Sequence, residues 1–188
     1  TDEPEALGLL SLMLLHDARR EGRLDGAGNM VPLEEQDRAL WDPAAIAEGC
    51  AVLDAALRRG RPGPYQVQAA IAACHATAAT SVATDWQEIA SLYKRLSEMV
   101  PSPIVELNRA VAVAMAEGPN AGLWLVERLE RSGALAGYHL LPATRADLLR
   151  RSGRLEEAQV AYREALALVG TDAERRYLLR RLGETLAI

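Results

Sequence analysis

The sequence contains no phenylalanine and few other aromatic residues. Of its 188 residues, 4% are aromatic, although 49% are apolar. The core therefore has to be built from Leu, Ala and Val, which favours closely packed helices over a sheet rich in aromatic and β-branched side chains. At this length we expect a single domain over residues 1–188 with a substantial core.

An excess of positive charge is also absent. The chain has 21 Lys and Arg against 26 Asp and Glu, which gives a formal net charge of −5. A domain that binds nucleic acid through its phosphates needs a basic surface. The composition therefore argues against direct DNA binding by this chain.

Cysteines are scarce, and long hydrophobic runs are lacking. Cys50 and Cys74 lie in apolar helical segments without C-x-x-C spacing, so we expect both to be small buried hydrophobes in a reducing cytoplasm. No apolar run approaches the ~18 residues that cross a bilayer, and the N-terminus does not show the pattern of a secretory signal. A cytoplasmic protein without membrane contact is therefore expected.

Small and aromatic residues recur at helical spacing between Arg145 and Leu168. Ala146, Gly153, Ala158, Tyr162 and Ala165 have the spacing of a tetratricopeptide (TPR) helix–turn–helix unit. The small residues allow two antiparallel helices to approach, Gly153 allows a left-handed turn, and Tyr162 fills the gap between the helices. Such a unit cannot bury its apolar face alone, so the rest of the chain should be helices stacked against it.

The remaining sequence is typical of helices separated by glycine and proline. We expect an all-α, TPR-like helical array, an α-solenoid of about nine helices, with a small β-hairpin or loop near residues 22–32. Apart from the two helices of the repeat, helices are expected over 3–20, 33–41, 43–59, 65–76, 86–99, 103–117, 121–131 and 173–186.

Particular residues indicate how these helices begin and pack. Asp42, Asp85, Ser102 and Asp172 are the expected N-caps. In the first helix the core face is expected to carry Leu7, Leu10, Leu14 and Ala18, with Leu15 beside it. A second, poorer repeat precedes the good one, with Gly122 and Val126 where the good repeat has Ala158 and Tyr162.

The histidines are the first candidates for catalysis or metal binding. His16 and Asp17 form the pair found in His-Asp metal phosphohydrolases, but that site needs further ligands, and only His75 and His139 remain. No G-x-S-x-G, P-loop or dinucleotide-binding motif occurs. We therefore expect no enzyme activity, no metal and no cofactor. A hydrolase would require all four residues to converge.

Two sets of polar and aromatic residues interrupt otherwise apolar helices. The first set, expected on one inner face, is Asn108, Arg109, Tyr138, His139, Arg145 and Asp147. The second set, on the earlier helices, is Asp37, Arg38, Trp41, Tyr65 and Gln66. Residues of this kind often line the partner-binding groove of a stacked helical array. Alternatively they pair between neighbouring helices, for example Arg109 with Asp147, and fix the stacking register.

Several strings in the sequence carry a resemblance to a known group of proteins. They are L-L-H-D-A-R-R (14–20), E-E-Q-D-R-x-L-W-D (34–42), I-A-E-G (46–49), R-G-R-P-G-P-Y-Q-V-Q-A-A-I-A-A-C-H-A (59–76), P-S-P-I-V-E-L-N-R-A-V-A-V-A (101–114) and G-Y-H-L-L-P-A-x-R-A-D-L-L-R-R (137–151). Together they resemble the C-terminal extension of a group of bacterial extracytoplasmic-function (ECF) RNA polymerase sigma factors. The resemblance extends over nearly the whole chain.

This resemblance implies a TPR-like domain that follows two sigma regions, regions 2 and 4, which this chain does not contain. It implies a non-catalytic regulatory or accessory domain whose partners are its own sigma regions, the RNA polymerase core, or both. DNA would be contacted only through the missing sigma regions. The alternative is a TPR-like domain that senses a small molecule or peptide and thereby controls the sigma regions.

Overall fold

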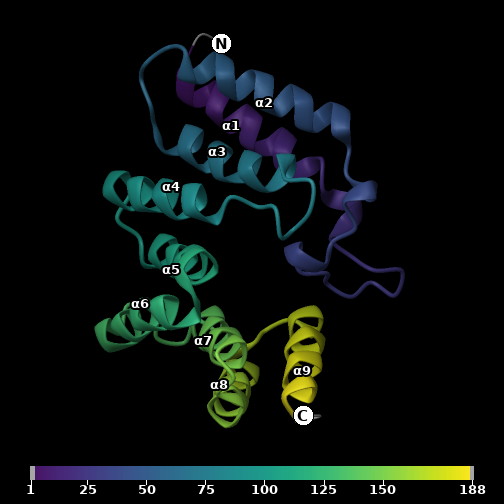
Figure 1. The fold of residues 1–188 in the computed structure, drawn as a ribbon, viewed down its shortest axis with the longest axis vertical. Helices are drawn as coiled ribbons and strands as arrows, with labels where there is room; N and C mark the ends of the chain where they lie inside the picture. The colour runs from purple at the N-terminus through teal and green to yellow at the C-terminus, as the bar shows by residue number, and fades with distance from the viewer. Residues whose placement is uncertain (1–2, 187–188) are drawn as a thin grey trace. The chain divides into compact units, whose positions relative to one another are not determined.

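The computed structural model describes residues 3–186, and α-helices dominate that range (Figure 1). Within it lie nine α-helices, three short 3-10 turns and no strand. The elements are α1 (Pro4–Asp17), η1 (Arg20–Gly22), η2 (Leu33–Glu35), η3 (Arg38–Leu40), α2 (Pro43–Leu57), α3 (Pro64–Thr77), α4 (Trp86–Met99), α5 (Pro103–Glu117), α6 (Pro119–Ser132), α7 (Leu140–Arg151), α8 (Leu155–Leu168) and α9 (Asp172–Leu186). The expected all-α helical array is confirmed.

Contacts along the chain separate two compact units. Unit 1 is Thr1–Ala27 with Val31–Pro101, and unit 2 is Gly28–Met30 with Ser102–Ile188. Unit 1 therefore contains helices α1 to α4, and unit 2 contains α5 to α9. The expectation of a single domain over 1–188 stays a prediction.

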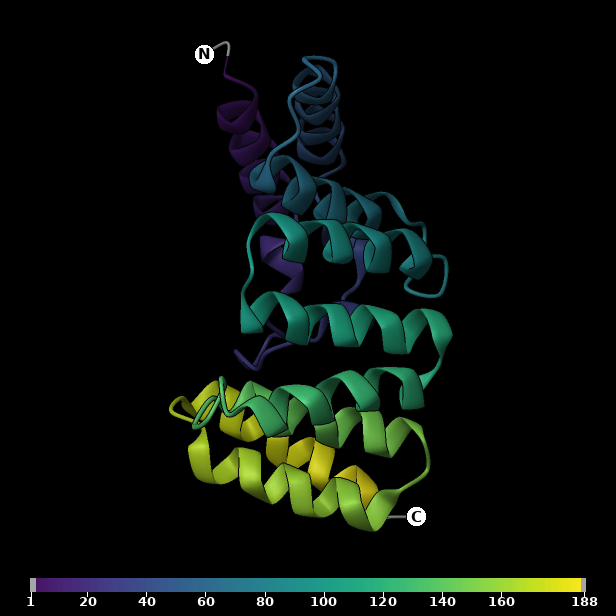
Figure 2. The same ribbon diagram turned by 90° about the vertical axis from the view of Figure 1, so that its left-hand side faces the viewer.

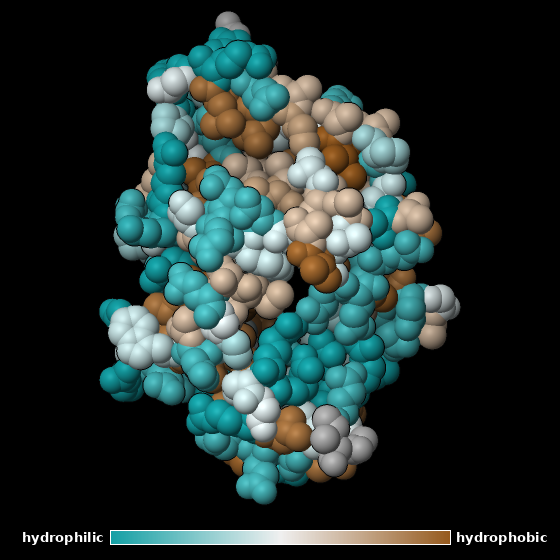
Figure 3. Space-filling model, in the orientation of Figure 1, coloured by the Kyte–Doolittle hydropathy of each residue, from teal (hydrophilic) through white to brown (hydrophobic). Residues whose placement is uncertain are grey.

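Helix α1 packs against both α2 and α3 in unit 1. Its buried residues are Pro4, Gly8, Ser11 and Leu15, whereas Leu10 is 46% exposed. The expected core face of this helix is therefore confirmed at Leu15 and Ala18, which are buried, and wrong at Leu10. Small residues determine which face of α1 is buried. At Gly8 there is no space for a side chain, because a Cβ would lie 2.8 Å from the backbone nitrogen of Gln66 on α3. Several apolar side chains remain on the surface of these helices: the region where Figure 1 shows α1 to α3 carries many hydrophobic residues in Figure 3.

The contact between α1 and α2 also depends on a small residue. A Cβ on Gly49 would lie 2.8 Å from Leu15 Cγ. At the same crossing the buried Ser11 hydroxyl donates a hydrogen bond of 2.7 Å to the carbonyl oxygen of Gly49. Gly49 therefore has two roles. Its missing side chain leaves space for Leu15, and its carbonyl oxygen accepts the hydrogen bond of Ser11, the only polar side chain on the buried face of α1.

The N-terminus of α3 is capped by a side chain from 60 residues away. The Glu5 carboxylate accepts hydrogen bonds from the backbone nitrogens of Tyr65 and Gln66 at 3.0 and 3.2 Å. It also accepts one from Gln66 Nε2 at 3.1 Å. A Cβ on Gly63 would collide with this carboxylate. The turn before α3 therefore leaves space for an acidic cap supplied by α1.

One local expectation, a helix over residues 33–41, needs correction, and for residues 22–32 the structure selects the loop over the hairpin. Residues 33–41 form the turns η2 and η3 rather than one α-helix, because the Asp37 carboxylate accepts a hydrogen bond from Ala39 N at 2.9 Å and begins a new turn. Residues 22–32 form a loop without a strand, joined by a hydrogen bond of 2.8 Å from Val31 N to Arg23 O.

The expected N-caps are confirmed at two positions and wrong at two. Asp42 accepts from Ala44 N and Ala45 N, and Asp85 accepts from Glu88 N. Ser102 makes no side-chain cap. At α9 the cap is Thr171 rather than Asp172: Thr171 Oγ1 accepts from Glu174 N at 3.3 Å and donates to the Glu174 carboxylate at 2.6 Å. The Thr171 hydroxyl thus caps the helix, and the Glu174 side chain accepts a hydrogen bond from that hydroxyl rather than from the backbone N–H that a full capping box uses.

Unit 2 consists of two antiparallel helix pairs, α5–α6 and α7–α8, with α9 packed on α8 (Figure 2). The second pair is the predicted repeat. Gly153 adopts φ 79° in the turn between its helices, and the Tyr162 side chain is 1% exposed. Ala146, Ala158 and Ala165 are completely buried. The packing roles expected for these residues are confirmed.

The poorer repeat has its own packing device. A Cβ on Gly122 of α6 would lie 2.6 Å from Ala110 O and 2.5 Å from Ala114 Cβ on α5. Because Ala110 O is a backbone atom, a side chain at this position would force the two helices apart.

We expect Gly122→Ala to lower the free energy of unfolding of unit 2 by about 1–3 kcal/mol, the range for overpacked cores. Chemical denaturation followed by circular dichroism measures this change. Gly183→Ala in α9 is the matched control, because nothing lies within 4 Å of its Cβ position. The control should be neutral or stabilising by up to about 1 kcal/mol. Equal losses in both variants would contradict the close-approach role of Gly122.

We expect Glu5→Ala to destabilise unit 1 by about 1–2 kcal/mol, because the N-terminal N–H groups of α3 lose their acceptor. The control is Glu3→Ala. Glu3 forms only an exposed ion pair with Arg61, at 3.8 Å, and its loss should change stability by less than about 0.5 kcal/mol. Thermal unfolding of both variants tests the difference. Indistinguishable midpoints would show that Glu5 is not an effective cap.

Candidate functional site

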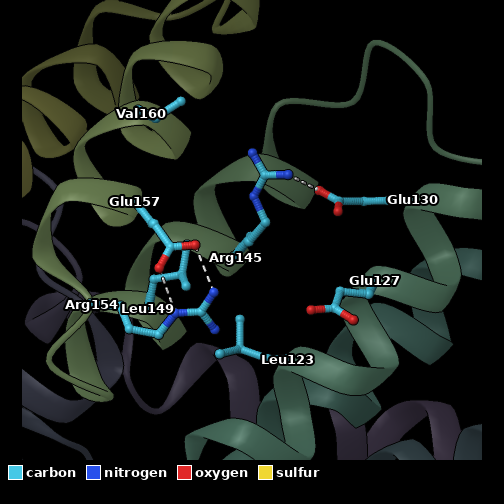
Figure 4. Close-up of a pocket in the computed structure, with 8 residues that line it drawn as sticks. All are labelled: Leu123, Glu127, Glu130, Arg145, Leu149, Arg154, Glu157 and Val160. Atoms are coloured by element: carbon cyan, nitrogen blue, oxygen red, sulfur yellow. Dashed lines mark hydrogen bonds and ion pairs between the residues drawn. The ribbon is translucent and has the colours of Figure 1, made fainter.

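Arg145 of α7 lies in a groove of unit 2 between α6 and α8 (Figure 4). Its Nη1 donates to Glu130 Oε1 of α6 at 2.7 Å, and its Nη2 pairs with the Glu164 carboxylate of α8. A hollow of about 350 Å³ opens beside this bridge. The residues that line it, which we call the Arg145 groove, are Leu123, Glu127, Glu130, Arg145, Leu149, Arg154, Glu157 and Val160.

The walls of the Arg145 groove carry more negative than positive charge. Its three carboxylates face two arginines. Arg154 is occupied by a two-point contact with Glu157, at 2.7 and 2.6 Å. Glu127, which points into the space between α6 and α8 in Figure 4, has no ion pair in the described part of the chain. Val160, 53% exposed, adds an apolar surface. This combination suits a basic, partly apolar segment of a partner.

A second hollow, of about 380 Å³, adjoins the first. Glu130 lines both hollows, and Glu164 lines the second. The remaining lining is mostly apolar and includes Tyr138, Leu141 and Leu168. Tyr138 and Arg145 are thus the two members of the first predicted set that lie along this groove.

The other members of the first set lie elsewhere in unit 2. Asp147 is two positions from Arg145 on α7, so the two side chains leave the helix on different faces. The Asp147 carboxylate accepts hydrogen bonds of 2.6 Å from both Arg150 and Arg151. Burial would raise the pKa of Asp147, but the hydrogen bonds and charges of these two arginines outweigh burial and lower the pKa.

The expected pairing of Arg109 with Asp147 is therefore wrong. Arg109 pairs with Glu106 at 3.0 Å, one turn away on α5, and the neighbouring Asn108 is exposed. His139 Nε2 lies 3.3 Å from the Glu174 carboxylate of α9. The first set does not form one patch: Arg109 and Asp147 pair within their own helices, whereas Arg145 and His139 contact carboxylates of other helices.

The second predicted set divides between the two ends of α3. At its N-terminal end Tyr65 is 42% exposed, whereas Gln66 is 1% exposed and is held by Glu5 and by the Arg61 carbonyl. The Gln66 side chain therefore acts in the packing of unit 1. Binding of a partner by the remaining residues of either set stays a prediction.

At the C-terminal end of α3, Arg38 connects three structural elements. Its Nη1 donates to the carbonyl oxygens of His75 and Ala78 at 2.7 and 2.8 Å. Its guanidinium Cζ lies 4.4 Å from the ring centroid of Trp41, which is 5% exposed. The Arg38 cation thus meets the negative end of the α3 dipole while it stacks on an indole ring.

Two functional candidates that the sequence reasoning missed complete this region. Arg19 is 8% exposed, with Cζ 5.6 Å from the Trp41 ring centroid. Arg23 Nη2 donates to the carbonyl oxygen of His16 at 2.7 Å. The available signal was a run of arginines just after the end of a helix, where cations are favoured. We call Arg19, Arg23, Arg38, Trp41 and His75 the Trp41 junction.

The His, Cys, Asp and Glu side chains were also compared with the requirements of a metal site and of a reactive thiol. Among residues 3–186, no group of three His, Cys, Asp or Glu side chains is placed to hold a metal ion. Cys50 and Cys74 are half-buried rather than fully buried, and burial raises the pKa of both thiols. Over the same described range, no helix is both long and apolar enough to span a membrane.

His75 packs edge-on against Trp86, with ring centroids 5.1 Å apart. Burial, and to a smaller extent the charges of Arg19, Arg38 and His16, lower the pKa of His75 from 6.5 to about 4. The folded state therefore resists protonation of His75, whereas the unfolded chain takes up a proton below pH 6.5.

We expect the stability contributed by this pKa difference to be complete above pH 6.5 and to be lost as the pH falls toward 4. The loss should be on the order of 1–3 kcal/mol. Unfolding measured across this range should show a shallower pH dependence for His75→Gln than for the wild type. NMR titration of the ring gives the pKa directly, and an ordinary value near 6.5 would contradict the prediction.

The chain is similar to one protein family over its first part and to one longer protein over nearly its whole length. Residues 1–57 match DUF6596, a family of unknown function. An uncharacterized protein of Rhizobium meliloti (strain 1021) is 47% identical over 180 residues, which cover 96% of this chain and 42% of that protein. The chain therefore spans less than half the length of this curated relative. No solved structure matches the chain. The similarity is thus to a family of unknown function over α1 and α2, and to an uncharacterized longer protein over nearly the whole chain.

Proposed function

We propose that this chain is a non-catalytic interaction domain of an ECF-type RNA polymerase sigma factor, active in the bacterial cytoplasm. It would modulate transcription initiation by binding its own sigma regions or the RNA polymerase core. The observation that carries the proposal is the Arg145 groove, with surplus carboxylates above apolar side chains. Such a surface suits a basic amphipathic helix of a partner protein.

The charge of the chain supports this choice of partner. A sigma region that contacts promoter DNA needs a basic surface, because the DNA backbone is negatively charged. A domain with a net charge of −5 is attracted to such a region and is repelled by DNA. In the Arg145 groove the unpaired Glu127 would meet a cationic side chain of the partner.

Sequence similarity gives independent support. The strings at 14–20, 59–76, 101–114 and 137–151 resemble the extension of ECF sigma factors over both units. The Rhizobium relative is more than twice as long as its matched part, so that protein has space for further domains. In this proposal those domains would include the sigma regions that the extension controls.

A second candidate is the sensing of a small molecule or peptide. The two hollows, of about 350 and 380 Å³, have volumes in the range of small-ligand sites, about 300–1,000 Å³. In this alternative a ligand in the groove would change the affinity for the sigma regions. A ligand that shifts the melting temperature and that competes with the sigma regions would favour this candidate.

The groove is tested by reversing the charge of Glu127, which forms no ion pair within residues 3–186. We expect Glu127→Lys to weaken binding of the isolated sigma regions by about tenfold and to reduce the salt dependence of binding. Glu117→Lys, at the exposed end of α5, is the matched control and should bind within about twofold of the wild type. Calorimetry at two salt concentrations measures both effects. Equal affinities for the two variants would exclude the groove as the binding surface.

Transcription from a cognate promoter tests the regulatory role itself. The full-length factor is compared with a truncation that ends before Thr1. A rise in transcription on truncation means that the domain restrains the sigma regions, and a fall means that they require it. Unchanged transcription would contradict the proposed function.

A further inference from the structure

Three neighbouring arginines of unit 1, two of them stacked on Trp41, form no ion pair with a carboxylate in the described residues. Arg19 and Arg38 lie over Trp41, with Cζ at 5.6 and 4.4 Å from its ring centroid. The charges of Arg23 and Arg38 both act on Arg19. In residues 3–186 no ion pair joins Arg19, Arg23 or Arg38 to an acidic side chain. Their neighbour Arg20, by contrast, pairs with Asp17 at 3.8 Å and with Glu21 at 3.0 Å.

Backbone carbonyls at two helix ends satisfy part of this charge. Arg23 donates to His16 O near the end of α1, and Arg38 donates to His75 O and Ala78 O at the end of α3. A helix C-terminus carries a partial negative charge of about one half of an electron. Two such ends offset about one of the three positive charges, so the three guanidinium groups are only partly compensated by the groups they contact.

Arg19 is the least compensated member of the cluster. It is 8% exposed, and its Nη2 lies 3.3 Å from His16 Nδ1. Its buried Nε has no hydrogen-bond partner in the described part of the chain. A buried guanidinium without an anion is costly. Burial, and then the charges of Arg23 and Arg38, lower the pKa of Arg19.

The surroundings contain further donors without acceptors. The indole nitrogens of Trp41 and Trp86 are buried and, within residues 3–186, make no hydrogen bond. His75, in contact with Trp86, is neutral at pH 7 because burial lowers its pKa to about 4. The Trp41 junction therefore combines positive charge with buried N–H groups, and none of its five residues is acidic.

We propose that the Trp41 junction is a binding site for a phosphate-type oxyanion, either free or carried as a monoester on a small molecule. Arg23, which is exposed, and Arg38, which is half-buried, would present their guanidinium groups to the phosphate oxygens. Trp41 holds the Arg38 guanidinium in place by stacking, so little ordering is needed on binding. Arg19 adds its charge from the buried side. The site lies in unit 1 and shares no residue with the Arg145 groove.

The test is thermal unfolding of the full chain against increasing sodium phosphate, with sodium chloride added to hold the ionic strength constant. We expect a saturable rise in melting temperature of about 2–4 °C. Arg23→Gln should weaken phosphate binding by about tenfold. Arg20→Gln, the adjacent arginine with its own acidic partners, should bind like the wild type. Phosphorus-31 NMR of the free and bound anion supplies a second readout that does not depend on unfolding.

A second arm separates the two sources of the anion. Glycerol 3-phosphate that binds more tightly than inorganic phosphate identifies a phosphate monoester, and equal affinities identify the free ion. Both results support the site. Arg38 is not substituted, because its loss would also remove the contacts with the end of α3. Arg23→Lys is added instead as a variant that keeps the charge and the fold. It should bind more weakly than the wild type, because the two-point guanidinium contact is lost.

Two results would overturn the proposal. One is the absence of a saturable shift with either anion. The other is an equal shift in the wild type and in Arg23→Gln, which would mean that phosphate acts on the protein without occupying this site. Glu127→Lys in the Arg145 groove should leave phosphate binding unchanged, so failure here is distinguishable from failure of the proposed function.

Discussion

Close approach of helix backbones is the constraint on which both units depend. Without phenylalanine, this chain cannot fill wide gaps between helices, and the gaps have to be narrow. Gly8, Gly49 and Gly122 each stand where a single Cβ would meet a neighbouring helix at 2.8 Å or less. Alanines such as Ala56, Ala110 and Ala161 are completely buried at similar positions. These contacts depend on the absence of side-chain atoms, and they leave no space for chemistry. Function therefore has to lie at the helix ends and in the grooves.

Helix positions were predictable because local residues set them. Pro43 after Asp42, and Gly153 between two amphipathic segments, act on their own stretch of backbone whatever the remainder of the chain does. The buried face of α1 was not predictable in the same way. Hydrophobicity favoured Leu10, but Gly8 and Ser11 form the contact. The backbones of α2 and α3 approach α1 so closely that only small side chains fit between them.

The candidate sites show the same division between local and distant information. The sequence located Arg38, Trp41 and Arg145 as polar or aromatic residues in unusual settings. Their partners are far along the chain: Arg38 meets the carbonyls of His75 and Ala78, 37 and 40 residues away. Arg145 meets Glu130 and Glu164, 15 and 19 residues away. Only the fold determines such partners. The separation of Asp147 from Arg145, in contrast, follows from helix geometry alone and could have been predicted.

The two candidate sites differ in charge, and this difference limits what each can bind. The Arg145 groove has surplus carboxylates and suits a cationic partner, whereas the Trp41 junction has surplus guanidinium groups and suits an anion. One ligand cannot satisfy both. The match to the family of unknown function covers residues 1–57, which include Arg19, Arg23, Arg38 and Trp41 but no residue of the Arg145 groove. That match thus extends over α1, α2 and the segment between them, where the three arginines lie. The groove lies outside residues 1–57, in a part of the chain that the longer Rhizobium relative also matches. The proposed partner of the groove therefore has no connection with the match to the family of unknown function.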